Sequence, residues 1–222
     1  MIPTRRDADF VAGQTALLFV DMQKVFALPG RDPLHPERDG EHAFHAHLRD
    51  TVIPNQRRIL AAARAAGIEV LHTVIRALTQ DGRDRSVDHK LSGILVARDD
   101  PDGDIIDELA PAGDEIVLPK TSSGVFNSTN IDYVLRNLGI RYLIVAGIVT
   151  DQCVDMAVRD AADRGYLVSV PRDASATYTS ERHEAALRAF GGYCWLTDTD
   201  TVVRRIEALS GSAPEGHTHA AR

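Results

Sequence analysis

The stretch YLIVAGIVTDQCVDMAVRDAADRGY, at positions 142–166, decides the fold class of this chain. Positions 142–146 form a short apolar run rich in branched side chains, which is typical of a buried strand. From position 150 onward the apolar residues follow a helical spacing, with Thr150 or Asp151 as the expected N-cap. A strand that leads directly into a helix indicates an α/β protein.

The same alternation recurs along the chain. Helical spacing occupies positions 59–66 and 131–138, and a glycine, Gly67 or Gly139, follows each of these segments, as is common at helix ends. We therefore predict a three-layer α/β/α fold around a mainly parallel, Rossmann-like sheet of about six strands. The other predicted strands cover positions 16–20, 69–74, 115–118, 166–170 and 193–196.

Length and composition favour one globular domain. With 222 residues, 44% of them hydrophobic and 26% charged, the chain fits a single α/β unit, which we assign to positions 1–209. The tail at positions 210–222 lacks periodicity, so we expect it to be flexible. Two irregular segments, at positions 28–47 and 83–103, follow predicted strands, and each is either a pocket lid or a plain surface insertion.

Charge and hydropathy exclude several classes of partner. The chain has 25 basic and 32 acidic residues and a net charge of −7, whereas nucleic acids and anionic membranes attract basic proteins. No apolar run approaches the roughly 20 residues that span a bilayer, and positions 1–12 lack the apolar core of a signal peptide. We therefore expect a cytoplasmic protein with no nucleic-acid or membrane partner.

Three residues of reactive type follow the ends of three predicted strands: Asp21, Lys120 and Cys153. Parallel strands end at one edge of their sheet, so these side chains can meet although they are far apart in the sequence. Taken singly, each has an ordinary explanation: a capping aspartate, a surface lysine or a buried cysteine. Cys194 keeps that ordinary explanation, and two cysteines are too few for a disulfide framework. The coincidence of the first three at one edge favours a catalytic site.

Cys153 falls in the first turn of the predicted helix. The N-terminus of a helix lowers the pKa of a thiol, and a nearby lysine lowers it further. We therefore expect Cys153 to supply a thiolate nucleophile near neutral pH, and Cys194 to be inert.

The motifs ALLFVDMQ, LPKTSSGVF and AGIVTDQCVDMAVRDAADRGY together resemble those of the isochorismatase-like cysteine hydrolases, and the resemblance covers about positions 14–209. It implies that Asp21, Lys120 and Cys153 form a catalytic triad. Family members that cleave a vinyl ether lack the cysteine, so Cys153 implies hydrolysis of a C–N bond in an amide or ureide.

The resemblance also implies a mechanism. The thiolate of Cys153 attacks the carbonyl carbon, and the backbone N–H groups of Val149 and Cys153 hold the oxyanion, as the N-terminus of a helix can. Asp21 takes the thiol proton and returns it to the departing nitrogen, which leaves a thioester that water hydrolyses. Lys120 keeps the cysteine and aspartate pair ionised. The family further implies a cis peptide bond between residues 148 and 149, and a homo-oligomer, either a dimer or a tetramer.

Carbamoyl compounds are the leading substrates under this interpretation: biuret, triuret, ureidoacrylate or an N-carbamoyl amino acid, with release of ammonia or an amine. A simple carboxamide, as in nicotinamidases or maleamate amidases, is the alternative. A non-catalytic scaffold is less favoured, because all three triad residues are present. Polar side chains suit a ureide, since each amide edge needs a partner, although packing, capping or surface roles stay open for several candidates. The candidate pocket residues are Gln23, Phe26, Arg76, Ser122, Ser123, Phe126, Asn127, Asn130 and Tyr178.

Neither a cofactor nor a metal is expected. DMQKVF, at positions 21–26, stands where a dinucleotide-binding fold needs its glycine-rich turn, which argues against an oxidoreductase. By resemblance, nicotinamidases bind a metal through an Asp-x-His pair and a further histidine, and no such pair follows His72. His42, His45 and His47 include the i, i+3 spacing of metal ligands, but we favour the solvated face of a helix.

Overall fold

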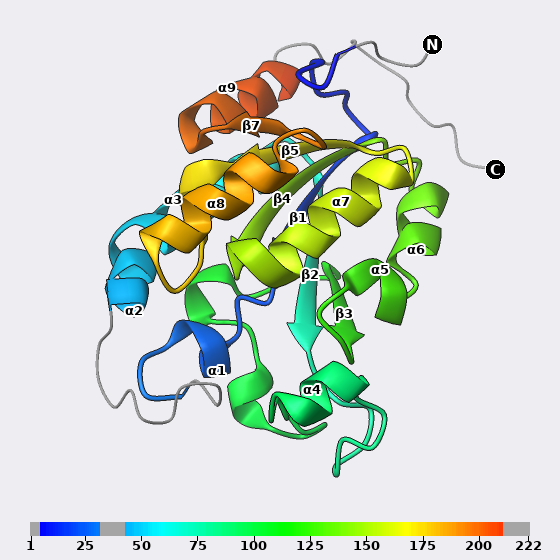
Figure 1. Cartoon of the computed structure of the whole chain (residues 1–222). Coiled ribbons are helices and arrows are strands. Elements are labelled where there is room, and N and C mark those ends of the chain that lie inside the picture. Colours follow the sequence, from blue (N-terminus) through cyan, green and yellow to red (C-terminus); the bar gives the residue numbers. More distant parts are fainter. Residues whose placement is uncertain (1–4, 32–42, 211–222) are drawn as a thin grey trace, which may run out of the picture.

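A parallel β-sheet forms the centre of the molecule (Figure 1). The computed structural model describes residues 5–31 and 43–210. The strand order is β3-β2-β1-β4-β5-β7, β6 pairs with the end of β4, and every pairing within this sheet is parallel. The strands are β1 (Thr15–Val20), β2 (Glu69–Ile75), β3 (Ile116–Lys120), β4 (Tyr142–Ile148), β5 (Leu167–Pro171), β6 (Ser175–Ala176) and β7 (Trp195–Thr197).

Helices cover both faces of the sheet, which gives three layers. In Figure 1, α7 (Asp155–Asp163) and α8 (Ser180–Phe190) cross in front of the strands, and α3 (Ile53–Ala65) lies behind them. The last helix, α9 (Thr199–Ser210), packs against α3. Strands β1 and β4 are buried along their whole length because both faces of the sheet are covered. The predicted three-layer α/β/α fold is therefore confirmed.

Shorter helices occupy the connections between these elements. Two of them, α2 and α4, belong to the two irregular segments of the sequence. The bounds are α1 (Lys24–Ala27), α2 (Ala43–His47), α4 (Val87–Leu91), α5 (Val125–Ser128) and α6 (Ile131–Asn137), with π-helical turns at Leu48–Val52 and Thr150–Val154 and 3₁₀ turns at Pro101–Gly103, Asp107–Leu109 and Arg172–Ala174.

The start of the helix after β4 differs from the prediction. It opens with the π-helical turn, and α7 continues from there. Neither Thr150 nor Asp151 is its N-cap, because α8 and the loop before it engage both side chains. Thr150 Oγ1 lies 2.9 Å from Nδ1 of His183. Asp151 accepts hydrogen bonds from Thr177 Oγ1 at 2.6 Å and from Arg182 Nε at 2.6 Å.

Some predictions fall on positions outside the described residues. Positions 32–42 belong to the first irregular segment, and positions 211–222 to the tail that the sequence predicts to be flexible. The second irregular segment is described in full and carries α4. Within the described ranges, no helix combines the length and the apolar character that crossing a membrane requires.

Candidate active site

Asp21 directly follows β1, and its backbone has a left-handed conformation with a φ of 55°. This conformation is uncommon for any residue with a side chain, and aspartate tolerates it better than most. The neighbouring strand β2 holds it in place. The Asp21 N–H donates to Thr73 O at 3.1 Å, and the Thr73 hydroxyl donates to Asp21 Oδ1 at 3.0 Å. The buried carboxylate is thus fixed at the carboxyl edge of the sheet.

Lys120 is the last residue of β3, and its side chain is fully buried. An ammonium group has three donors. The Lys120 Nζ forms an ion pair with Asp21 Oδ2 at 2.9 Å and donates to Ser122 O at 3.0 Å and to Cys153 Sγ at 3.5 Å. Burial by itself lowers the pKa of this ammonium, but the neighbouring Asp21 and Cys153 outweigh burial and raise the pKa above its ordinary value. Lys120 therefore stays charged at neutral pH.

Cys153 lies in the π-helical turn after β4 and is 5% exposed. The peptide bond between Ile148 and Val149, just before this turn, is cis, as the family resemblance implies. Gly147 lets the end of β4 approach β1 closely, since a Cβ at this position would lie 2.2 Å from Val20 O. The three predicted triad residues therefore meet beside one another.

The surroundings of Cys153 favour the neutral thiol. Burial raises the pKa of Cys153 to about 12; the positive charge of Lys120 opposes this rise, and the negative charge of Asp21 adds to it. The expectation of a lowered thiol pKa is therefore wrong, because loss of solvation outweighs the positive charge of Lys120. At neutral pH the sulfur keeps its proton, so a base has to remove that proton when the sulfur attacks.

A small cavity of about 30 Å³ opens onto the sulfur. Asp21, Val149 and Cys153 are among the residues that line it. Phe44 from the first irregular segment and Ile94 from the second form part of its apolar wall, so both segments help to line a pocket. The volume is about that of one water molecule.

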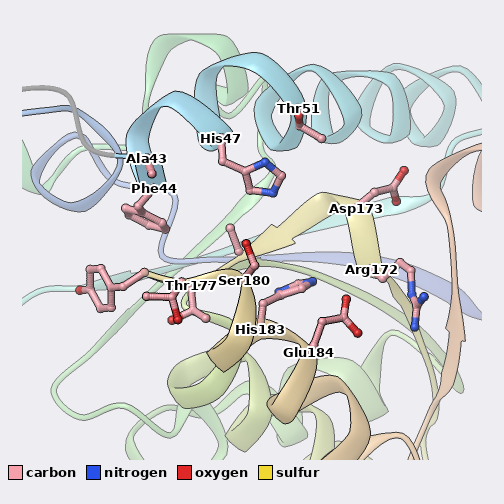
Figure 2. Close-up of a pocket in the computed structure, with 13 residues that line it drawn as sticks. Ala43, Phe44, His47, Thr51, Arg172, Asp173, Thr177, Ser180, His183 and Glu184 are labelled. Carbon is pink, nitrogen blue, oxygen red and sulfur yellow. The ribbon is translucent and has the colours of Figure 1, made fainter.

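A larger pocket of about 350 Å³ adjoins this cavity, and the rings of Phe44 and Tyr178 border both spaces. The two ring centroids are 5.1 Å apart. In Figure 2, His47 and His183 point into the larger pocket from opposite sides. The Phe44 and Tyr178 pair thus lies between the cavity at the sulfur and a wider pocket whose lining is mixed apolar and polar.

Comparison with known proteins assigns this chain to a family. The model of the Isochorismatase domain matches residues 15–201. The chain belongs to the isochorismatase family. Relatives include ureidoacrylate amidohydrolase RutB of Serratia proteamaculans (strain 568), 33% identical over 93% of this chain and 89% of that protein, and RutB of Pantoea ananatis (strain LMG 20103), 35% identical over 75% and 70%. A crystal structure of a cysteine hydrolase from Pseudomonas syringae pv. phaseolicola 1448A is similar, with a TM-score of 0.79, 28% identity and coverage of 91% of this chain and 96% of that one.

In this isochorismatase-family chain, three of the predicted pocket residues line the small cavity: Phe26, Ser123 and Tyr178. Gln23 serves the scaffold instead. Its buried side-chain amide donates to Ile75 O at 2.9 Å and to Gly103 O at 2.8 Å, and its Oε1 accepts from the Ile75 N–H at 2.6 Å. With both N–H groups and the oxygen engaged, this amide ties β2 to the second irregular segment.

The remaining pocket candidates do not line the cavity. Arg76 donates to Asp104 Oδ1 at 2.7 Å, directly after the second irregular segment, and to Asp100 O at 3.4 Å within it. Phe126 is buried in the core, whereas Asn127 and Asn130 are exposed. The pocket is therefore narrower than the sequence predicts, because the chain turns away from the cavity into α5 soon after β3 ends.

Two buried polar residues that support the site escaped the sequence reasoning. Thr73, which orients Asp21, pairs with Val20 across the parallel strands. The signal for it was available, since it is a hydroxyl residue in an otherwise largely apolar strand. His89 contacts Ser123 from α4. No periodic pattern in the second irregular segment could have indicated this contact.

The histidines near α2 do not form the surface that the sequence predicts. His42 lies outside the described residues. His45 is buried next to Phe44, with ring centroids 5.2 Å apart, so the solvated position expected for it is wrong, whereas His47 is exposed. Among residues 5–31 and 43–210, no three histidine, cysteine, aspartate or glutamate side chains are grouped as metal ligands would be.

Proposed function

We propose that this chain is a cysteine-dependent amidohydrolase that cleaves a C–N bond in a small ureide, with Asp21, Lys120 and Cys153 as its catalytic residues. The observation that carries the proposal is the buried contact of one ammonium group with both the carboxylate and the sulfur. Membership of the isochorismatase family supports hydrolysis. The activity named for the two RutB relatives supports a carbamoyl substrate of the kind of ureidoacrylate, biuret, triuret or an N-carbamoyl amino acid.

The first step forms the bond between sulfur and carbon. Asp21 takes the Sγ proton of Cys153 while the sulfur attacks the carbamoyl carbon, and the carbonyl electron pair moves onto oxygen. The negative charge passes from the carboxylate to the sulfur and then to this oxygen, so the net charge of the site does not change. Lys120 stays positive beside the charge as it moves. A thiol with a raised pKa can therefore react without first becoming a free thiolate.

The oxyanion that forms on the carbonyl oxygen needs hydrogen-bond donors beside it. We assign this role to the backbone N–H groups of Val149 and Cys153, since both residues line the cavity and Cys153 lies in the first turn of a helix. Each fixed donor of this kind contributes about 3 kcal/mol to stabilising the transition state.

Two further steps complete the reaction. The tetrahedral intermediate collapses, the C–N bond breaks, and the departing nitrogen takes the proton from Asp21, which leaves a thioester on Cys153. The same carboxylate then removes a proton from a water molecule that attacks the thioester. The C–S bond breaks, the sulfur regains its proton, and the acid or carbamate leaves.

Ammonia or amine release from a panel of amides tests the proposed activity. The panel contains ureidoacrylate, biuret and N-carbamoylglycine as ureides, and nicotinamide and maleamate as simple carboxamides. We expect turnover of at least one ureide at a higher kcat/KM than either carboxamide. Turnover of the carboxamides alone would replace the ureide assignment, and a folded protein that releases nothing from any of them would contradict the proposal.

Substitution of the two cysteines tests the nucleophile. Cys153→Ala removes the attacking atom, so turnover falls to background, and mass spectrometry of the wild-type protein quenched during turnover finds an acyl or carbamoyl adduct on the peptide that contains Cys153. Cys194→Ala is the matched control, because Cys194 is also buried but does not line the cavity. Retained activity in Cys153→Ala, or an equal loss in Cys194→Ala, would overturn the assignment.

A further inference from the structure

A histidine and a serine at the edge of the cavity form a pair that the proposed mechanism does not use. Ser123 follows the end of β3 and lines the cavity together with Asp21 and Cys153. His89 on α4 is completely buried, and its Nε2 lies 3.2 Å from Ser123 Oγ. The backbone of the same helix is anchored by Ser86, whose hydroxyl accepts from the His89 N–H. A buried imidazole thus stands directly behind a hydroxyl group that faces the reactive cavity.

The charges around His89 keep its ring neutral. Burial lowers the pKa of His89, and the positive charge of Lys120 lowers it further. Asp88 and Asp21 oppose this shift, Arg85 adds to it, and the pKa stays below its ordinary value. At neutral pH the ring therefore carries one proton, on either Nδ1 or Nε2.

The unpartnered nitrogen indicates which of the two carries the proton. Nδ1 of His89 is buried and has no hydrogen-bond partner among residues 5–31 and 43–210. A buried N–H group without an acceptor is rarer in proteins than an acceptor without a donor. The proton therefore belongs on Nε2, which donates it to Ser123 Oγ. With its oxygen accepting from the ring, Ser123 is left with a hydroxyl hydrogen to donate into the cavity.

The sheet order separates Ser123 from the proposed oxyanion donors. Ser123 follows β3 and Val149 follows β4, while β2 and β1 lie between these two strands. Asp21, at the end of β1, lies between the two walls. The backbone N–H groups thus reach the cavity from the β4 side and Ser123 from the β3 side, so the two sets of donors can hold two different oxygens of one substrate.

We propose that Ser123 donates a hydrogen bond to a second oxygen of the substrate, beyond the carbonyl that is cleaved, and that His89 is the positioning residue that keeps this hydroxyl a donor. The inference rests on the proposed function and narrows it. The substrate class is a ureide whose carbamoyl nitrogen carries a group with a carbonyl or carboxylate oxygen, as in biuret, ureidoacrylate or N-carbamoylglycine. An alkylurea without such an oxygen offers the Ser123 hydroxyl no acceptor in the cavity.

Ser123→Ala tests the substrate contact with two ligands of similar size. Biuret carries the second oxygen and N-propylurea lacks it, and each is measured as a substrate or as a competitive inhibitor, with ureidoacrylate and N-carbamoylglycine as further acceptor-bearing ligands. We expect the variant to weaken kcat/KM or binding about tenfold for the acceptor-bearing ligands. For N-propylurea, we expect kcat/KM or binding to change less than about threefold in the same variant. An equal loss for both kinds of ligand would overturn the proposal.

Variants of His89 test whether it acts through Ser123. His89→Leu removes the ring N–H, and we expect it to lower kcat/KM or binding of the acceptor-bearing ligands by the same factor as Ser123→Ala. His89→Gln restores a side-chain N–H near the position of Nε2, so we expect it to recover most of this loss. In the Ser123→Ala background, His89→Leu should add nothing, as in a double-mutant cycle of coupled residues. A full additional loss in that background, with unchanged thermal unfolding, would show that His89 does not work through Ser123.

The test separates this inference from the proposed function. If the wild-type protein hydrolyses no ureide, the proposed function fails. If it hydrolyses biuret and N-propylurea equally well, and Ser123→Ala does not change that ratio, the proposed function stands and only the role of Ser123 and His89 fails.

Discussion

The Lys120 ammonium organises the candidate site at the scale of single residues. It forms an ion pair with Asp21 and donates hydrogen bonds to Cys153 Sγ and to the backbone oxygen of Ser122, and the side chain is fully buried. A buried charge is costly unless it is paired, so the lysine and the aspartate depend on each other. The sulfur is the weakest of the three acceptors and stays protonated in the resting protein. Reactivity therefore depends on the carboxylate as much as on the cysteine.

Asp21→Asn separates the two roles of this carboxylate. Turnover should fall about a thousandfold or more, because the base is lost. Alkylation of Cys153 by iodoacetamide should become faster at mildly alkaline pH, because the negative charge that raises the thiol pKa is gone while Lys120 remains. Asparagine also tolerates the left-handed backbone at this position.

The two rates are measured as product release and as labelling of the Cys153 peptide by mass spectrometry, with the Cys194 peptide as an internal control. Slower labelling of Cys153 in Asp21→Asn than in the wild-type protein would contradict this account of the thiol pKa.

At the scale of elements, the sequence predicts what depends on periodicity and misses what depends on irregular backbone. Asp21 and Lys120 could be placed at one edge because strand ends follow from apolar runs and parallel pairing. The contacts of Gln23 and Arg76 could not be predicted, because their partners Gly103 and Asp104 lie in a part of the chain without a repeating pattern. Strand β6 could not be predicted either, because it is too short to produce an apolar run.

A substitution at Gly147 tests the close packing of β4 against β1. Its φ is 140°, and an added Cβ would lie 2.2 Å from Val20 O, so Gly147→Ala forces β4 away from β1. We expect a loss in unfolding free energy of about 3 kcal/mol or more, together with loss of activity. Gly139→Ala is the matched control: its φ of 74° is also left-handed, but the space around it is open, and we expect a loss of about 1 to 2 kcal/mol.

Urea unfolding of both variants measures the difference. Equal losses in Gly147→Ala and Gly139→Ala would mean that the close approach of β4 to β1 has no energetic weight beyond the backbone conformation itself.

At the scale of the whole molecule, a buried histidine makes stability depend on pH. His72 in β2 is 1% exposed, lies 5.6 Å from the Phe19 ring by centroid distance, and has Nε2 3.6 Å from Glu115 Oε2. Burial lowers the pKa of His72 to about 4, and Glu115 only partly opposes this. The folded protein therefore holds a neutral imidazole that the unfolded chain would protonate at a higher pH.

The assembly of this chain into a homo-oligomer stays a prediction from the sequence.

The sign of the pH dependence follows from the lowered pKa of His72. The folded state binds the proton less well than the unfolded state, so the contribution of His72 to stability is complete above its ordinary pKa of 6.5 and is lost as the pH falls toward 4. The loss amounts to about 3 kcal/mol. His72→Gln should lose less stability over the same pH range, and His47→Gln, at an exposed histidine, should behave as the wild-type protein does. Urea unfolding at pH 6.5 and pH 4.5 measures both; an equally steep decline in His72→Gln would point to other groups.

The protonation state of the buried sulfur also governs how easily Cys153 is oxidised. Hydrogen peroxide converts thiolates to sulfenic acid and leaves neutral thiols largely untouched. We therefore expect Cys153, which is held as a neutral thiol beside a cavity of about 30 Å³, to resist oxidation in the protein without substrate. Free-thiol titration after peroxide exposure should still count this sulfur as reduced.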